Sequence, residues 1–198
     1  MDLSEENTAS DYLDLSLGEF LERVASDGAA PGGGSVAAIA VALAAGLAGM
    51  AARLSTSQLS DAPELAEQAD ASRRRVALLA RADAESYGRV LEAYRDPEGR
   101  TARVRDALSG AADVPLAVAV AGSEVVGIAA RLAEEGNPNL RGDALAAVLL
   151  AGAGVRAASA LVGINLSSAD VDDDRLRKAN SLVDTTAATV LRATRGEG

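Results

Sequence analysis

Carboxylates and amides, rather than imidazoles or thiols, are the groups with which this chain could do chemistry. Its 198 residues contain no histidine and no cysteine. Their absence removes the commonest general base, the thiolate nucleophile, the Ser-His-Asp mechanism and the usual ligands of zinc. Proton transfer is therefore left to aspartate, glutamate, serine, tyrosine, the arginines and the single lysine, Lys178.

The most distinctive segment is the run Gly32, Gly33, Gly34 and Ser35, which opens an apolar stretch from Val36 to Ala52. Glycines and a serine at a helix start leave backbone N–H groups exposed, and the helix dipole there favours an anionic or carbonyl-bearing ligand. The run lacks the P-loop lysine and no strand precedes it, which excludes that nucleotide site. Close packing of two backbones is the alternative explanation for the glycines.

Asp83 interrupts an apolar stripe on the next predicted helix. The stripe repeats every three or four residues, through Leu65, Ala69, Ser72, Val76, Leu79, Asp83, Ser86 and Val90. Tyr87 lies one turn beyond Asp83. A carboxylate on a buried face must be paired, hydrogen-bonded or turned toward a cavity, because unpaired burial is costly or shifts the pKa. A structural ion pair with an arginine and a functional role are both open.

Three further polar side chains break apolar stretches. Glu124 is the one charge in the segment 114–130, where it predicts either a ligand contact or a salt bridge in the core or a dimer interface. Asp143 begins a stripe that reaches Asn165, and Asn137 lies in the preceding loop. Asp143 could instead complement its helix dipole, and Asn165 could bond a neighbouring carbonyl group.

Composition excludes several classes of partner and site. The net charge of −10 and the aromatic content of 2% argue against nucleic-acid binding. The acidic segment 170–174 lacks the glycine and the closing glutamate of an EF-hand loop, so no metal site is predicted. The N-terminus has no signal pattern, and the segment 36–52 is a poor membrane span that favours a buried helix. We therefore expect a cytoplasmic protein with no membrane partner.

The elements that must position these groups are helices. Long segments of 3.6-residue period with short links predict an all-α, single-domain bundle of about seven helices. Residues 1–15 are predicted as a loose leader, and residues 16–198 as a helical domain that begins with a capping box at Ser16. Asp61 and Asp170 are predicted to cap later helices. Three helices are apolar nearly all round, so they must be central or covered by a second subunit, and a homodimer is expected.

The octapeptide Pro31-Gly32-Gly33-Gly34-Ser35-Val36-Ala37-Ala38 resembles the cyclodeaminase/cyclohydrolase family of folate enzymes. That family includes the C-terminal domain of formiminotransferase-cyclodeaminase and the single-domain methenyltetrahydrofolate cyclohydrolases. The resemblance continues through the segments 17–25, 83–87, 115–125, 136–143 and 162–166. Leu161 departs from the pattern, because the family is expected to carry an asparagine there.

The resemblance implies an all-helical dimer that acts on a one-carbon derivative of tetrahydrofolate, with no separate cofactor. Hydrolysis of 5,10-methenyltetrahydrofolate to 10-formyltetrahydrofolate is favoured for a chain with no formiminotransferase half. Release of ammonia from 5-formiminotetrahydrofolate by a cyclodeaminase is one alternative, and a non-catalytic helical dimer or scaffold is another.

The resemblance also implies a division of roles within the site. Asp83 and Asp143 are the expected catalytic pair, which would move protons or stabilise a cationic carbon. Ser35 and the glycines would hold the pterin or a carboxylate of the glutamate tail, the two asparagines would orient the substrate, and Tyr87 would line the pocket. The expected substrate-binding residues are Gly32, Gly33, Gly34, Ser35, Tyr87, Glu124, Asn137 and Asn165.

Overall fold

The structure, a computed structural model, describes residues 12–95 and 97–195. Its elements are η1 (Tyr12–Asp14), α1 (Leu17–Ala25), α2 (Gly33–Arg53), α3 (Ala62–Arg95), α4 (Arg100–Gly110), α5 (Asp113–Glu135), η2 (Pro138–Leu140), α6 (Arg141–Ser168) and α7 (Asp174–Arg195). These described residues contain no strand, so the prediction of an all-α fold is confirmed. Most of the predicted leader, residues 1–11, lies outside the described residues.

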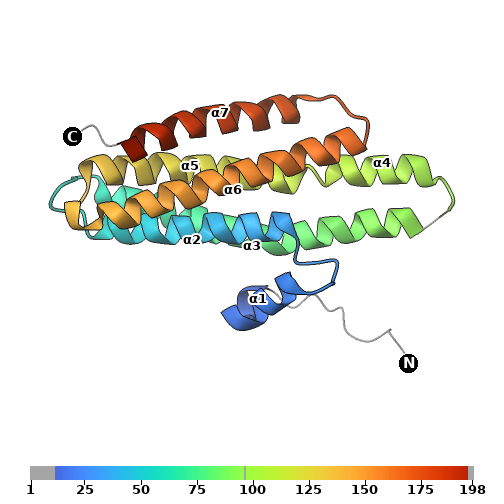
Figure 1. The fold of residues 1–198 in the computed structure, drawn as a ribbon, viewed down its shortest axis with the longest axis horizontal. Coiled ribbons are helices and arrows are strands. Elements are labelled where there is room, and N and C mark those ends of the chain that lie inside the picture. The colour runs from blue at the N-terminus through green and yellow to red at the C-terminus, as the bar shows by residue number, and fades with distance from the viewer. Residues whose placement is uncertain (1–11, 96, 196–198) are drawn as a thin grey trace.

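The long helices α2, α3, α5 and α6 form an elongated bundle, and α7 packs on α5 and α6 (Figure 1). α2 and α6 run antiparallel, since Gly33 at the start of α2 lies beside Leu161 near the end of α6. α4 leads into α5 through a short junction, and α1 lies to one side of the bundle, ahead of the link to α2 (Figure 1).

Small side chains allow the central helices to approach closely. A Cβ atom added to Gly154 of α6 would lie 2.4 Å from Cγ2 of Val41 in α2. One added to Gly122 of α5 would lie 2.7 Å from Cγ2 of Val155 in α6. Protein interiors are packed to crystal density, so these glycines are fixed by contact between helices. The alanine-rich composition thus gives a tight core with few aromatic rings.

Of the three predicted helix caps, one is confirmed, one lies at the expected position with its carboxylate bonded to an arginine, and one is wrong. The capping box of Ser16 and Glu19 is present as predicted. Asp61 precedes α3, but its carboxylate accepts a hydrogen bond from Nη2 of Arg131 at 3.0 Å. At α7 the cap is Asp173, whose carboxylate accepts the N–H of Arg175 at 2.8 Å. The Asp170 prediction was wrong because several acids in one segment compete for a single cap.

Three helical segments, 33–53, 100–135 and 138–168, are long and apolar enough to cross a membrane by length and composition. The bundle buries 50% to 61% of their most apolar windows. α2 packs against α3, α5 and α6.

Candidate functional site

A cavity of about 350 Å³ lies at the N-terminal end of α2. It brings together six of the predicted site residues: Gly32, Gly33, Gly34, Asp83, Tyr87 and Asn165. They come from α2, α3 and α6, which are adjacent in the bundle. The rest of the lining is Ala29, Ala30, Ala84, Ser86, Ala111, Leu161 and Ile164. Leu161, the departure from the family pattern, therefore gives the cavity an apolar wall where an amide was expected.

Asp83 of α3 caps α2 from the neighbouring helix. Its Oδ2 accepts the N–H of Ser35, the third residue of α2, at 2.9 Å. The Ser35 hydroxyl donates to the carbonyl oxygen of Ala80 at 2.7 Å and lies 3.2 Å from the same Oδ2. This is the bond that an N-cap side chain normally makes, and the helix dipole stabilises the carboxylate there. The partner of Asp83 is thus a helix end rather than an arginine.

The absence of a side chain at Gly34 allows the Asp83 carboxylate to come this close to the start of α2. A Cβ atom at Gly34 would lie 2.0 Å from Oδ1 of Asp83 and 2.4 Å from its Cγ. The carboxylate occupies the space that any side chain would need. Close approach, one of the two explanations open from the sequence, therefore holds at this glycine.

The occupied helix end changes what the cavity can bind. An anionic ligand placed there would meet the carboxylate of Asp83, because like charges repel at short range. Among the described residues that line the cavity, Asp83 is the one acid, and there is no arginine or lysine. The electrostatics favour a neutral or cationic ligand group, and they argue against a tail carboxylate held by Ser35.

Burial raises the pKa of Asp83 above its usual value of 3.8, and the hydrogen bonds from the Ser35 side chain and backbone oppose that shift. Desolvation is the largest cause, since the side chain lies in the cavity wall. A carboxyl group with a raised pKa exchanges a proton nearer to neutral pH, as a general acid or base must.

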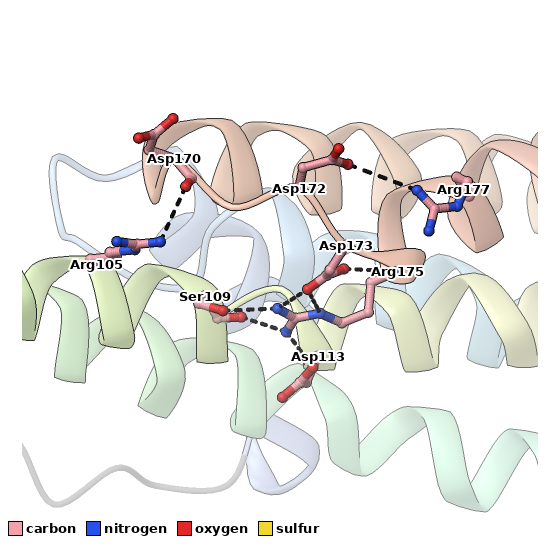
Figure 2. A network of polar contacts seen from close by, with 8 residues as sticks. All are labelled: Arg105, Ser109, Asp113, Asp170, Asp172, Asp173, Arg175 and Arg177. Carbon is pink, nitrogen blue, oxygen red and sulfur yellow. Dashed lines mark hydrogen bonds and ion pairs between the residues drawn. The ribbon is translucent and has the colours of Figure 1, made fainter.

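Asn165 and Arg175 hold one wall of the cavity from two sides. Nδ2 of Asn165 donates to the carbonyl oxygen of Ala111, in the α4–α5 junction, at 2.9 Å. Nη1 of Arg175 donates to the carbonyl oxygen of Ser109 and to Oδ1 of Asp113, each at 2.7 Å (Figure 2). The prediction that Asn165 could bond a carbonyl group is therefore confirmed, and the same side chain lines the cavity.

Asn137 and Asp143 lie away from the cavity within one chain. Asn137 donates its N–H to the hydroxyl of Ser55 at 2.9 Å and its Nδ2 to the carbonyl oxygen of Leu54 at 3.0 Å, just beyond the end of α2. Asp143 is the third residue of α6, 22 positions before Asn165, which corresponds to about 33 Å of helix. The predicted pairing of Asp83 with Asp143 does not occur inside a single chain.

Glu124 also lies outside the cavity. Its carboxylate forms a short ion pair with Arg75 of α3 and lies 3.4 Å from the Ser72 hydroxyl. Its side chain is 47% exposed, so the segment that looked continuously apolar leaves this position at the surface. A salt bridge is therefore present, but it lies at the surface of the chain rather than in the core. A salt bridge across a dimer interface and a substrate contact stay predictions.

Sequence reasoning missed several lining residues. Ala111 gave no signal in the sequence, because it is a small apolar residue in the link between α4 and α5. Ile164 was part of an apolar run, so its exposure to the cavity was hidden. Within the described residues, no three acidic side chains lie close enough together to hold a metal ion.

Comparison with known proteins identifies the family. The family model described as formiminotransferase-cyclodeaminase matches residues 16–185. This chain belongs to the formiminotransferase-cyclodeaminase family. The resemblance seen in the sequence is therefore confirmed, and the cavity lies within the matched region.

The relatives of this family member carry two different activities in their names. A methenyltetrahydrofolate cyclohydrolase of Methylorubrum extorquens is 33% identical over 180 residues, covering 83% of this chain and 86% of the relative. The formimidoyltransferase-cyclodeaminase of Rattus norvegicus is 33% identical over 175 residues, covering 82% of this chain but 32% of the relative. A crystal structure of formiminotetrahydrofolate cyclodeaminase from Thermotoga maritima matches with a TM-score of 0.78 and 30% identity, covering 92% of this chain and 93% of that chain.

Proposed function

We propose that this enzyme of the folate one-carbon family hydrolyses 5,10-methenyltetrahydrofolate to 10-formyltetrahydrofolate. The observation that carries the proposal is the Asp83 carboxylate in the cavity wall. Apart from the phenol of Tyr87, it is the one ionisable side chain among the described residues that line the cavity. A cationic amidinium carbon fits such a site, because a fixed carboxylate in a partly desolvated cavity stabilises a cation strongly.

The reaction needs one group that accepts and returns a proton. Water adds to the amidinium carbon and forms a C–O bond, while Asp83 accepts a proton from that water. The bond from the carbon to N5 then breaks, and N5 takes up the proton that Asp83 held. The hydroxyl on the carbon loses its proton to solvent and becomes the C=O of the formyl group, which remains on N10. One proton is released overall, since a cation and water give a neutral product. The raised pKa of Asp83 suits both proton transfers.

The helix end supports this role of Asp83. The Ser35 N–H holds Oδ2 at 2.9 Å, while Oδ1 lies over Gly34. The carboxylate is therefore oriented before substrate arrives, which is the preorganisation that electrostatic catalysis requires. Tyr87, Leu161 and Ile164 would line the pterin site, and Asn165 would present its amide to the ring.

Cyclodeamination is the second candidate. It is favoured by the similarity to the Thermotoga maritima cyclodeaminase over nearly the whole of both chains. In that reaction N10 attacks the formimino carbon and ammonia leaves, so the same carboxylate would transfer protons between nitrogens. The two reactions share a cationic carbon beside Asp83.

We further propose that Asp143 reaches the cavity from a second copy of the chain. α2 and α6 are antiparallel neighbours that expose apolar residues on repeats of seven, Val36 and Leu43 on α2 and Leu150 and Ile164 on α6. A twofold axis near Leu43, at the midpoint of α2, would place the Asp143 end of the partner beside this chain's cavity. Such an isologous contact would cover the apolar stripes and complete the carboxylate pair.

The decisive assay follows loss of the near-ultraviolet band of 5,10-methenyltetrahydrofolate against the spontaneous rate. We expect turnover by the wild type and a loss of at least about 100-fold in kcat for Asp83→Asn, the usual size of a general acid–base contribution. Asp184→Asn, an exposed carboxylate on α7, serves as the matched control and keeps full activity. Ammonia release from 5-formiminotetrahydrofolate instead would select the cyclodeaminase, and activity on neither substrate would favour the scaffold.

A further inference from the structure

Ser86 of α3 differs from the other buried polar side chains of the described residues. These side chains are Ser35, Ser55, Ser72, Ser86, Ser159 and Thr186. Five of them form hydrogen bonds with described residues. Ser86 is only 3% exposed, yet its hydroxyl forms no hydrogen bond with a described residue. It does not donate to the carbonyl oxygen one turn earlier, as Thr194 does at 2.8 Å.

The Ser86 hydroxyl opens into the cavity beside Asp83. Ser86 is one of the residues that line this cavity. Within the described residues, no buried side-chain oxygen or nitrogen is both closed to solvent and without a partner. The Oγ atom of Ser86 therefore reaches open space, and the cavity is the open space that the residue lines. Much of the remaining lining is apolar, including Leu161 and Ile164, so this hydroxyl is one of few points where a water could be held.

A free acceptor lies one helical turn before Ser86. Asp83 is three residues earlier on α3, so the two side chains share a face and their Cβ atoms are about 5–6 Å apart. Oδ2 of Asp83 accepts the N–H of Ser35 at 2.9 Å, while Oδ1 accepts no hydrogen bond from a described residue. Two hydrogen bonds of about 2.8 Å each span about 5.5 Å. One water can therefore bridge Oδ1 of Asp83 and Oγ of Ser86.

We propose that Ser86 holds the attacking water between its hydroxyl and the free oxygen of Asp83. The inference rests on the proposed function and deepens it by naming the group that positions the nucleophile. The water donates one hydrogen to Oδ1 of Asp83, which takes this proton as the C–O bond forms, and the other to Oγ of Ser86. A lone pair of the water then faces the cationic carbon. Such orientation raises kcat, because the entropic cost of placing the nucleophile is met before the reaction.

The same hydroxyl separates the two candidate reactions. Hydrolysis needs a water at the cationic carbon. In cyclodeamination N10 is the nucleophile, and a water held at that carbon would hydrolyse the methenyl product. Ser86 therefore favours hydrolysis over cyclodeamination.

Ser86→Ala tests this role, because it removes only the hydroxyl. With 5,10-methenyltetrahydrofolate as substrate, we expect kcat to fall about tenfold, the size of one hydrogen bond. KM should stay unchanged, since the hydroxyl contacts the water rather than the folate. Ser159→Ala is the matched control and should keep the wild-type kcat. Ser159 is also a buried serine, but its hydroxyl donates to the carbonyl oxygen of Ala179 at 3.2 Å and does not line the cavity.

Thermal stability gives a readout that a structural role would reverse. The Ser86 hydroxyl has no partner in the described chain to lose, and alanine is the better helix former. Ser86→Ala is therefore expected to leave Tm unchanged or to raise it by about 1–2 °C. Ser159→Ala breaks a buried hydrogen bond and should lower Tm. A lower Tm for Ser86→Ala would show that the hydroxyl is bonded within the protein and would overturn the inference.

The outcomes distinguish the inference from the proposed function. Hydrolysis by the wild type with an equal kcat in Ser86→Ala overturns the inference and leaves the function standing. Absence of hydrolysis by the wild type overturns the function, and the nucleophilic role of the water with it. Crystal structures of both proteins complete the test. We expect a water bonded to Ser86 and Asp83 in the wild type that is missing from Ser86→Ala, and a wild-type cavity with no water at this place contradicts the inference.

Discussion

At the scale of single residues, Asp83 combines two demands on one carboxylate. It accepts the Ser35 N–H as a helix cap, which favours the charged form, and burial in the cavity wall disfavours that form. Burial is the larger effect, so the folded-state pKa lies above the unfolded value of 3.8. Since the native state then binds the proton more tightly, the stabilising contribution is full below 3.8 and is lost as pH rises through the raised pKa.

This sign gives a prediction for Asp83→Asn, which keeps an oxygen acceptor for Ser35 but cannot ionise. The free energy of unfolding of the wild type minus that of the variant should fall as pH rises from below 3.8 through the raised pKa, and be constant beyond it. Urea titrations at a series of pH values measure this difference in unfolding free energy. The contributions of the other carboxylates are the same in both proteins and therefore cancel. A difference that grows with pH would show that the cap outweighs desolvation.

Gly34 supplies a second prediction at this scale. Gly34→Ala would drive a methyl group into the Asp83 carboxylate, 2.0 Å away, and break its bond to Ser35. We expect a loss of about 1–3 kcal/mol in unfolding free energy, as for overpacking or an unmade buried hydrogen bond. Gly127→Ala is the matched control, since nothing lies within 4 Å of its Cβ position and an exposed helical Gly→Ala change stabilises by about 0.5–1 kcal/mol. If Gly34→Ala and Gly127→Ala shifted the temperature of thermal unfolding equally, the close contact between Gly34 and the Asp83 carboxylate would be refuted.

At the scale of elements, Arg175 ties three of them together. It is the second residue of α7, and its guanidinium group donates to Ser109 near the end of α4 and to Asp113 at the start of α5 (Figure 2). Its side chain is only 23% exposed, and one of its acceptors is the carbonyl oxygen of Ser109 in the last turn of α4, which also accepts the N–H of Ala112 at 3.2 Å. The junction that it fixes contains Ala111, which lines the cavity.

We therefore expect Arg175→Ala to lower the unfolding free energy by about 1–3 kcal/mol and to speed amide hydrogen exchange at the α4–α5 junction. Arg177→Ala is the control, because its partners Asp172 and Asp174 are 93% and 90% exposed and screened by water. Hydrogen exchange read by mass spectrometry tests both. Unchanged exchange at residues 109–113 in Arg175→Ala would mean that packing alone holds the junction.

The helices could be predicted from the sequence because their signals are local. Apolar residues at spacings of three and four placed Asp83 on a buried stripe, and Gly32–Ser35 marked the start of α2. What could not be predicted depends on contacts between helices. No local pattern shows that Asp83 would cap α2 or that Asp173, rather than Asp170, would cap α7. The length of α6 alone separates Asp143 from Asn165 by about 33 Å, but which of the two ends meets Asp83 and the start of α2 depends on how the helices pack.

At the scale of the whole molecule, the exposed apolar stripes of α2 and α6 are the surface on which the proposed dimer would form. Leu43 is 61% exposed and Ile164 is 59% exposed, on helices that are otherwise packed in the core. Leu150, which shares the helix face of Asp143 and Asn165, is 41% exposed. Leu43→Glu should give a species of the monomer mass, 19.9 kDa, in sedimentation velocity. Leu78, which is 59% exposed on α3, lies outside these stripes, so Leu78→Glu should leave the proposed dimer intact.

A shared site makes a sharper prediction, which does not depend on disrupting the contact. If Asp83 of one chain acts with Asp143 of the other, Asp83→Asn and Asp143→Asn should each be inactive alone. In a mixed dimer one site carries both substitutions and the other carries neither. Random exchange makes half of the dimers mixed, so the mixture should recover about one quarter of the wild-type turnover, as twofold symmetry requires. Full activity of Asp143→Asn alone, or no recovery on mixing after proven subunit exchange, would restrict the chemistry to Asp83 and the cavity of a single chain.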